Sequence, residues 1–172
     1  MNKKGLVVWI TGLSGSGKTT IAKKIVRKLK VHKPIHLDGD DLREILDIKG
    51  KTTYSKKSRE KIGLIYSKFA NYLANQGNFV VVSVMALNNS TFYWNKKNIK
   101  NYFEIYLDVP NNELVKRDPK GIYKNFKKGI IKNISGFDIS FDEPKKPDLK
   151  IDWKKTKKTS DIVKTILQKI DK

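Results

Sequence analysis

The sequence predicts an α/β fold, a parallel doubly wound sheet flanked by helices, on two main observations. Apolar runs typical of buried strands alternate along the chain with segments of helical periodicity, as in sheets whose parallel strands are joined by helices. The first apolar run, residues 6–10, leads directly into a glycine-rich loop and then a helix. The sequence has no linker, repeat or second apolar core, so residues 1–172 are expected to form one domain.

The glycine-rich loop at residues 12–19 reads G-x-x-x-x-G-K-T, the phosphate-binding loop (P-loop, or Walker A motif) of ATP- and GTP-using enzymes. The strand before it and the helix expected at 20–30 disfavour a chance glycine-rich turn. Glycines let backbone N–H groups point at a phosphate, and the helix N-terminus favours its negative charge. Lys18 is expected to reach the β- and γ-phosphates of ATP, and the Thr19 hydroxyl to bind Mg²⁺. The predicted ATP-binding residues here are Gly12, Ser14, Gly15, Ser16, Gly17, Lys18, Thr19 and Thr20.

Composition limits the class of protein. Hydrophobic residues make up 38% of the 172 residues, which is enough for the core of one domain. Cysteine is absent, so disulfides and thiolate metal sites are excluded. No apolar stretch approaches the ~20 residues of a membrane span, and the first apolar run is too short for a secretory signal. We therefore expect a cytoplasmic protein without a membrane partner.

The formal net charge of +20 raises the question of a nucleic-acid partner. The basic residues are nearly all lysine and are spread along the chain, with arginine only at positions 27, 43, 59 and 117. A nucleic-acid interface would gather arginines and aromatic side chains on one face, so we expect solvated lysines and no nucleic-acid partner. The alternative is a non-enzymatic or RNA-binding protein that uses the loop for regulation, which steeply salt-dependent RNA binding would reveal.

An acidic segment follows the second predicted strand, residues 31–38. It contains Asp38, Asp40 and Asp41 and ends at Arg43. Carboxylates just past a strand end lie at the edge where open α/β sheets bind ligands. Asp40 or Asp41 would also serve as the cap of the next helix, but one aspartate suffices for a cap. The pattern therefore favours a ligand site at this segment.

The remaining elements follow from periodicity and turn residues. A polar loop is expected at 47–57, followed by a helix at 58–75 whose apolar side is Ile62, Ile65, Phe69, Tyr72 and Leu73. Further strands are expected at 79–85, 102–107 and 149–152, and further helices at 113–117 and 159–170. Residues 118–129 are basic and interrupted by glycines, which suggests a lid over phosphates. His32 and His36 are expected to be structural.

Five blocks of sequence together resemble the adenylylsulfate (APS) kinase family along almost the whole chain: residues 12–19, 37–43, 117–124, 131–133 and 143–149. Many kinases share the first block, whereas the blocks around Asp38–Asp40 and Asp118–Lys124 are far more specific. The resemblance implies a P-loop kinase that transfers the γ-phosphoryl group of ATP, with Mg²⁺, to the 3′-hydroxyl of a nucleotide's ribose. It also implies a homodimer and a lid at about residues 117–135.

The family pattern assigns the catalytic roles to three residues. Asp40 would accept or orient the proton of the 3′-hydroxyl. Asp38 would help to hold the water shell of Mg²⁺ or the ribose. Lys18 would neutralise charge on the transferred phosphate, because phosphoryl transfer depends on positioning and electrostatic stabilisation.

The same pattern places basic residues around both nucleotides. Arg43 and Arg59 would grip the phosphate of the substrate, for which a planar guanidinium group is better suited than an ammonium group. Lys120 and Lys124 would close over both nucleotides. Arg117 would lie near the base or ribose of ATP.

The chain departs from the family pattern around the expected acceptor. An asparagine of the family is replaced by Ile62, and a phenylalanine that stacks on the substrate adenine is replaced by Ile134. Tyr54 stands at the position of the second aromatic ring. An adenine between two rings gains roughly 1–3 kcal/mol per stacked face, so the loss of one ring weakens the preference for adenine. The predicted substrate-binding residues are Asp38, Asp40, Arg43, Tyr54, Arg59, Ile62, Lys120 and Ile134.

These departures favour a remodelled acceptor pocket. The favoured acceptor is cytidine diphosphoramidate, the substrate of APS-kinase-like enzymes in bacterial capsule phosphoramidate synthesis. A true APS kinase of sulfate assimilation is the first alternative, because drift within the family also produces such changes. A kinase for a sugar or a shikimate-like acid is the second, but it would not explain the block at Asp118–Lys124.

Overall fold

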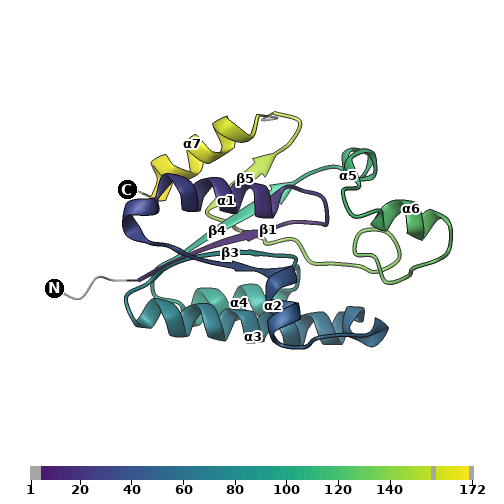
Figure 1. The fold of residues 1–172 in the computed structure, drawn as a ribbon, viewed down its shortest axis with the longest axis horizontal. Coiled ribbons are helices and arrows are strands. Elements are labelled where there is room, and N and C mark those ends of the chain that lie inside the picture. Colours follow the sequence, from purple (N-terminus) through teal and green to yellow (C-terminus); the bar gives the residue numbers. More distant parts are fainter. Residues whose placement is uncertain (1–4, 156–157, 171–172) are drawn as a thin grey trace.

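The computed structural model describes residues 5–155 and 158–170, and a parallel sheet forms its centre (Figure 1). The strands are β1 (Leu6–Thr11), β2 (Ile35–Asp38), β3 (Phe79–Val84), β4 (Tyr102–Asp108) and β5 (Leu149–Asp152). They lie in the order β2-β3-β1-β4-β5, with every neighbouring pair parallel. The predicted fold class is therefore confirmed. The predicted domain ends, residues 1 and 172, lie outside the described residues.

Helices cover both faces of the sheet (Figure 1). They are α1 (Lys18–Lys28), α2 (Gly39–Ile45), α3 (Lys56–Asn75), α4 (Asn89–Asn98), α5 (Asn111–Arg117), α6 (Ile122–Lys127) and α7 (Thr159–Ile170), with 3₁₀ turns η1 (Lys30–His32) and η2 (Lys51–Tyr54). On one face, Ile25 of α1 and Ile166 of α7 pack with Ile105 of β4 in one apolar cluster. On the other, Tyr66 of α3 packs with Trp9 of β1 in a second cluster. The sheet is thus buried on both sides, as its nearly continuous apolar strands predict.

The second strand is shorter than predicted. Residues 31–38 were expected to be a strand, but residues 30–32 form η1 and β2 begins only at Ile35. Lys33 has a left-handed backbone with φ of 46°, and the following Pro34 has no N–H to give to a ladder. These two residues form a turn that delays the strand.

The expected buried side of α3 was wrong in part, since only Ile62 and Leu73 of its five residues pack against the core. Ile65, Phe69 and Tyr72 are 38%, 43% and 61% exposed, and the side chains that face the sheet are those of Ile62, Tyr66, Ala70 and Ala74. The inward face carries small residues, which let the helix approach its neighbours closely. A Cβ at Gly63 would lie only 2.5 Å from the Thr91 hydroxyl oxygen of α4. Apolar periodicity alone misses a face built in this way.

Three local features around the helices also differ from expectation. The helix α4 was not predicted, because its inward face includes the polar residues Thr91 and Asn95. The loop expected at 47–57 contains η2, and α3 begins within it at Lys56, after the cap Ser55. The cap of α2 is Asp38, whose carboxylate accepts from the backbone N–H of Asp40; neither Asp40 nor Asp41 is the cap.

Parallel strands bring all their carboxyl ends to one edge of the sheet. The P-loop follows β1 there, α2 follows β2, and α5 and α6 extend from β4 on the right-hand side of Figure 1. Polar and charged residues from distant parts of the chain therefore meet at this edge. Within the described residues, no helix combines the length and the apolarity needed to cross a membrane.

Candidate active site

The P-loop forms a cradle between β1 and α1. Gly12, Gly15 and Gly17 have φ values of 154°, 76° and 96°, a range that L side chains rarely adopt. A Cβ at Gly12 would also lie 2.9 Å from the carbonyl oxygen of Leu107. The loop ends at the N-terminus of α1, where unpaired N–H groups and the helix dipole favour an anion. The cradle therefore fits the phosphates of a nucleotide.

Lys18 lies over this cradle. Its ammonium group donates a hydrogen bond to the carbonyl of Leu13 at 2.8 Å. Burial lowers the pKa of Lys18 to about 8, the positive charge of Lys120 adds to the effect, and Asp38 and Asp40 oppose it. An anion in the cradle would offset the cost of burying this charge, since opposite charges favour the ionised form.

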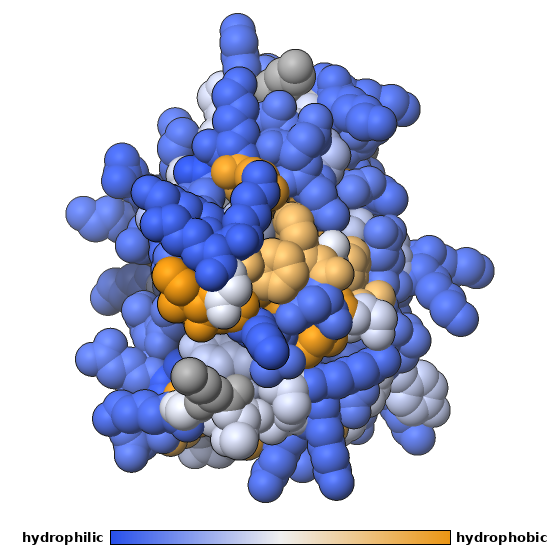
Figure 2. All heavy atoms as spheres, turned by 90° about the vertical axis from the view of Figure 1, so that its right-hand side faces the viewer, coloured by the Kyte–Doolittle hydropathy of each residue, from blue (hydrophilic) through white to orange (hydrophobic). Residues whose placement is uncertain are grey.

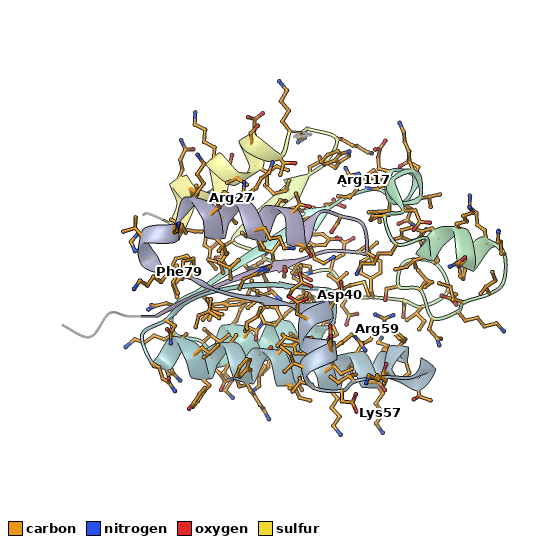
Figure 3. All side chains as sticks on the ribbon, in the orientation of Figure 1. Arg27, Asp40, Lys57, Arg59, Phe79 and Arg117 are labelled. Carbon is orange, nitrogen blue, oxygen red and sulfur yellow. The ribbon has the colours of Figure 1, made fainter. Side chains whose placement is uncertain are left out.

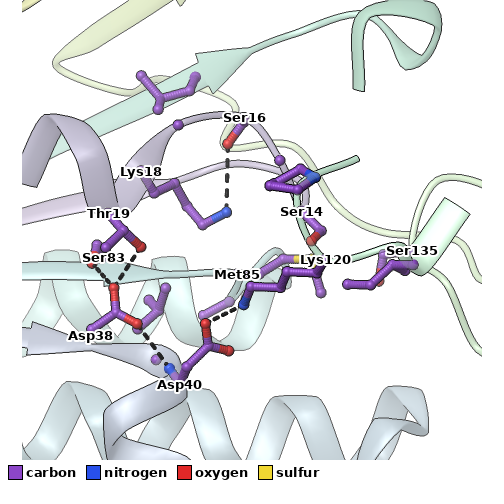
Figure 4. Close-up of a pocket in the computed structure, with 18 of the residues that line it drawn as sticks. Ser14, Ser16, Lys18, Thr19, Asp38, Asp40, Ser83, Met85, Lys120 and Ser135 are labelled. Carbon is purple, nitrogen blue, oxygen red and sulfur yellow. Dashed lines mark hydrogen bonds and ion pairs between the residues drawn. The ribbon is translucent and has the colours of Figure 1, made fainter. Parts of the chain in front are cut away.

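Asp38 accepts three hydrogen bonds, one of them from the P-loop (Figure 4). The hydroxyls of Thr19 and Ser83 each donate to Oδ2 at 2.7 Å, and the backbone N–H of Asp40 donates to Oδ1 at 3.0 Å. Burial alone would raise the pKa of Asp38, but these bonds outweigh it and hold the pKa below its ordinary value. Because the Thr19 hydroxyl donates its hydrogen bond to Asp38, the lone pairs of the Thr19 oxygen remain available to a cation such as Mg²⁺.

Asp40 lies in the first turn of α2, where it meets the lid. Its carboxylate, labelled in Figure 3, forms an ion pair with Lys120 (Figure 4), and both side chains are more than half exposed. The contact joins residues 80 positions apart in the chain. Asp38 and Asp40 therefore lie next to the P-loop, on the side of β2.

Arg43, Tyr54 and Arg59 form a second group beyond Asp40. The guanidinium carbons of Arg43 and Arg59 lie 4.6 and 5.4 Å from the centre of the Tyr54 ring. Arg43 donates to the hydroxyl and carbonyl oxygens of Thr53 at 3.1 and 3.3 Å. Arg59 donates to the carbonyl oxygens of Tyr54 and Asn133 at 2.9 Å each, so it ties η2 to the lid.

One cavity of about 1460 Å³ connects these groups. Pockets for a single small molecule measure about 300–1,000 Å³, so this cavity has room for two substrates. Every residue predicted to bind ATP or the acceptor lines it except Gly12, the first residue of the P-loop, and Lys124. Ile62 contributes little surface because it is only 8% exposed and packs in the core. Lys124 of the lid is exposed and does not line the cavity, unlike Lys120.

A family model described as adenylylsulphate kinase matches residues 4–152 of the chain. A cytidine diphosphoramidate kinase of Campylobacter jejuni subsp. jejuni is 39% identical over 172 residues, which cover 99% of each chain. A probable adenylyl-sulfate kinase of Pyrococcus abyssi is 34% identical over 151 residues, covering 87% of this chain and 86% of the relative. The chain belongs to the adenylylsulphate kinase family.

Structural similarity leads to the same family. The Mycobacterium tuberculosis APS kinase, solved in complex with AMPPNP and APS, superimposes with a TM-score of 0.89 at 30% identity, covering 98% of this chain and 99% of that one. The chain is therefore a kinase, a phosphotransferase that uses ATP with Mg²⁺. In this structure, the cradle and Lys18 fit the phosphates of ATP, and the Thr19 hydroxyl fits Mg²⁺.

The structure adds residues to this kinase's site that the sequence did not single out. Ser83 is the register partner of Asp38 on the neighbouring strand, and its hydroxyl also lies 2.9 Å from His36 Nε2. Tyr123 of α6 is buried and donates its hydroxyl proton to the carbonyl of Ser14 at 2.7 Å. A polar residue inside the apolar run 79–85 was the available signal for Ser83. The signal for Tyr123 was its place in the family block at residues 117–124, but the sequence assigned it no role.

Proposed function

We propose that this kinase transfers the γ-phosphoryl group of ATP to the ribose 3′-hydroxyl of a nucleotide. The observation that carries the proposal is the bond from Thr19 to Asp38, 2.7 Å long, which joins the P-loop to the acidic segment. A donor phosphate in the cradle and an acceptor hydroxyl at Asp40 would then share one cavity. Closeness and orientation of this kind supply much of the catalysis in phosphoryl transfer.

Each polar residue at the contact between the P-loop and the acidic segment has a role in this proposal. Asp40 orients the acceptor hydroxyl and takes its proton as the phosphoryl group is transferred. Lys18 stabilises the charge on the transferred group. Thr19 and Asp38 would hold Mg²⁺, which would supply positive charge to neutralise the phosphates. Lys120 leaves its ion pair with Asp40 as the substrates enter, and the lid at about 117–135 excludes water.

The acceptor that we propose is cytidine diphosphoramidate. Support comes from the relative of that name, which matches at 39% identity over 99% of both chains. The second support is Ile134, a partly buried aliphatic residue on the cavity wall where the family pattern has a ring that stacks on adenine. APS is the second candidate, because several relatives of 31–35% identity are adenylyl-sulfate kinases.

A coupled assay of ADP release tests this proposal. Cytidine diphosphoramidate, APS and plain nucleotides are compared at equal concentrations, and phosphorus NMR of the product locates the new phosphate on the ribose. We expect the cytidine substrate to have the largest kcat/KM, by about tenfold or more, the size expected for one lost stacking contact. Fast turnover of APS would overturn the choice of acceptor. A product phosphorylated at another position would overturn the assignment of the 3′-hydroxyl as the group that accepts the phosphate.

We also propose that the kinase is a cytoplasmic homodimer without a nucleic-acid partner, with residues 1–172 as one domain. The dimer and the location rest on the family resemblance. A hexameric APS kinase of Thiobacillus denitrificans has the same fold at 21% identity. Light scattering coupled to size-exclusion chromatography separates these states: a mass of about twice 19.8 kDa supports the dimer, and a larger or smaller particle contradicts it.

A further inference from the structure

The two histidines of the chain lie in different surroundings. His32 is exposed at the end of η1, whereas His36 is half-buried in β2, two residues before Asp38. Since side chains alternate along a strand, His36 and Asp38 point to the same face of the sheet. Ser83 and Asp38 line the cavity, but His36 does not. Any effect of His36 on the reaction must therefore pass through a neighbour.

A chain of hydrogen bonds joins His36 to Asp38. Nε2 of His36 lies 2.9 Å from the hydroxyl oxygen of Ser83, which in turn lies 2.7 Å from Oδ2 of Asp38 (Figure 4 for the second bond). Ser83 has a single hydroxyl proton, and it donates this proton to Asp38 because an ionised carboxylate only accepts. His36 must therefore donate through Nε2 to the oxygen of Ser83. Both bonds then run in one direction, from His36 to Ser83 to Asp38.

We propose that His36 is a positioning residue of the kinase, which holds Asp38 in its working orientation through Ser83. Oδ2 of Asp38 accepts from two hydroxyls, those of Ser83 and Thr19. The bond from His36 keeps the Ser83 proton directed at Asp38, and without this bond the hydroxyl is free to turn to another acceptor. The carboxylate then loses one of the two bonds on Oδ2 and is held less firmly beside Thr19. This inference rests on the role proposed above for Asp38.

Loss of His36 should slow the reaction without weakening the binding of ATP. The cradle and Lys18, which hold the phosphates in the proposed mechanism, make no hydrogen bond to His36 among the described residues. A histidine that merely supported the fold would lower the melting temperature and leave kcat of the folded protein unchanged. A histidine that supported the cradle would raise the Kd for ATP. The comparison of kcat with Kd therefore separates a positioning role from both.

His36→Leu, which removes the donor, tests the proposal in the ADP-release assay. We expect kcat to fall about tenfold or more, the size expected when a partner that orients a functional carboxylate is lost, while the KM and the calorimetric Kd for ATP stay within about twofold. His36→Gln places an amide donor near the position of Nε2 and should recover most of kcat. His32→Leu is the matched control and should match the unaltered kinase. An unchanged kcat in His36→Leu, or a Kd that rises as kcat falls, would overturn the proposal.

A double-mutant cycle with Ser83→Ala tests the route through Ser83. Ser83→Ala removes only one oxygen atom, so it gives a result even if His36→Leu folds poorly. We expect Ser83→Ala to lower kcat at least as much as His36→Leu, and the double variant to be slower than Ser83→Ala by no more than about twofold. Losses that multiply in the double variant would show that His36 acts independently of Ser83 and would overturn the route.

Asp38→Asn separates this proposal from the function on which it rests. We expect it to lower kcat more than either His36→Leu or Ser83→Ala, since it changes the group that both hold. A normal kcat in Asp38→Asn would overturn the role of Asp38 itself, and with it the role of His36. A slow Asp38→Asn beside a normal Ser83→Ala would overturn the role of His36 alone.

Discussion

The two sides of the cavity are built in different ways. On the P-loop side, backbone groups form the binding surface: glycine turns, the N-terminus of α1 and the carbonyls that hold Lys18 and Arg117. On the other side, side chains form it, and these reach in from α2, η2, α3 and the lid. Figure 2, which shows the right-hand face of Figure 1, has an apolar area at its centre surrounded by hydrophilic side chains.

This difference explains how one family can serve more than one acceptor. A backbone cradle depends on the conformation of a few consecutive residues, so most changes there destroy it. A surface of side chains changes its chemistry when one or two residues are replaced, as we propose for Ile134. We therefore expect variants of the P-loop side to abolish transfer with every acceptor. Variants of the acceptor side should change the choice of acceptor instead.

The largest effect is expected for Lys18→Ala. In the proposed mechanism this change removes the cation that stabilises the transferred phosphate, which should lower kcat by on the order of 10³-fold or more. The loss should be equal for APS and for the cytidine substrate, and the ADP-release assay measures both. Lys24→Ala is the matched control, because Lys24 is exposed on the same helix and does not line the cavity. Near-normal turnover of Lys18→Ala would contradict the assignment of the P-loop side.

Asp40→Asn should have the next largest effect. Loss of a proton acceptor should lower kcat by on the order of 10²–10⁴ while ATP still binds, since Asp40 does not belong to the cradle. Calorimetry measures ATP binding separately from turnover. Asp41→Asn is the neighbouring control and should keep most of the activity. If both variants lose activity to the same degree, the general charge of the segment matters and the position of Asp40 does not.

A smaller effect, on selectivity, is expected for Ile62→Asn combined with Ile134→Phe. These changes restore the family residues and should shift the ratio of kcat/KM toward APS by about tenfold. Ile62 is a core residue, so the single variant Ile134→Phe shows the effect without a buried amide. Ile139→Phe is a control just beyond the lid, because Ile139 does not line the cavity. An unchanged ratio in both Ile134 variants would show that the acceptor is chosen elsewhere.

The difference between the backbone surface of the P-loop side and the side-chain surface of the acceptor side also determines which parts of the site could be predicted from the sequence. The P-loop side is one contiguous motif between a strand and a helix, so its binding residues could be predicted from the sequence alone. The acceptor side depends on contacts between distant segments, such as Arg59 with Asn133 and Lys120 with Asp40. The role of Ser83 depends on the register of β3 against β2, which a sequence does not specify. Most of the inward face of α3, apart from Ile62, was missed because small residues, which apolar periodicity overlooks, face the sheet.

The smallest effect concerns Glu104 of β4, which belongs to neither side of the cavity. Its side chain is fully buried, accepts from the Tyr102 hydroxyl at 2.9 Å and lies 3.4 Å from the ammonium group of Lys96. Burial raises the pKa of Glu104, although Tyr102 and Lys96 oppose the shift. Since the folded protein holds this proton more tightly than the unfolded chain, stability should fall as pH rises from the ordinary pKa of glutamate through the raised value.

Glu104→Gln should remove this fall, because an amide does not titrate. Thermal unfolding between pH 4 and 8 should show the melting temperature of the variant rising relative to the unaltered kinase as pH increases, while turnover with either acceptor keeps its pH dependence. Glu44→Gln, exposed on α2, should leave the difference unchanged. If Glu104→Gln changed the pH dependence of both the melting temperature and turnover, the titration of this carboxylate would affect the cavity as well as the sheet. In that case the two sides of the cavity are not independent of the core beneath them.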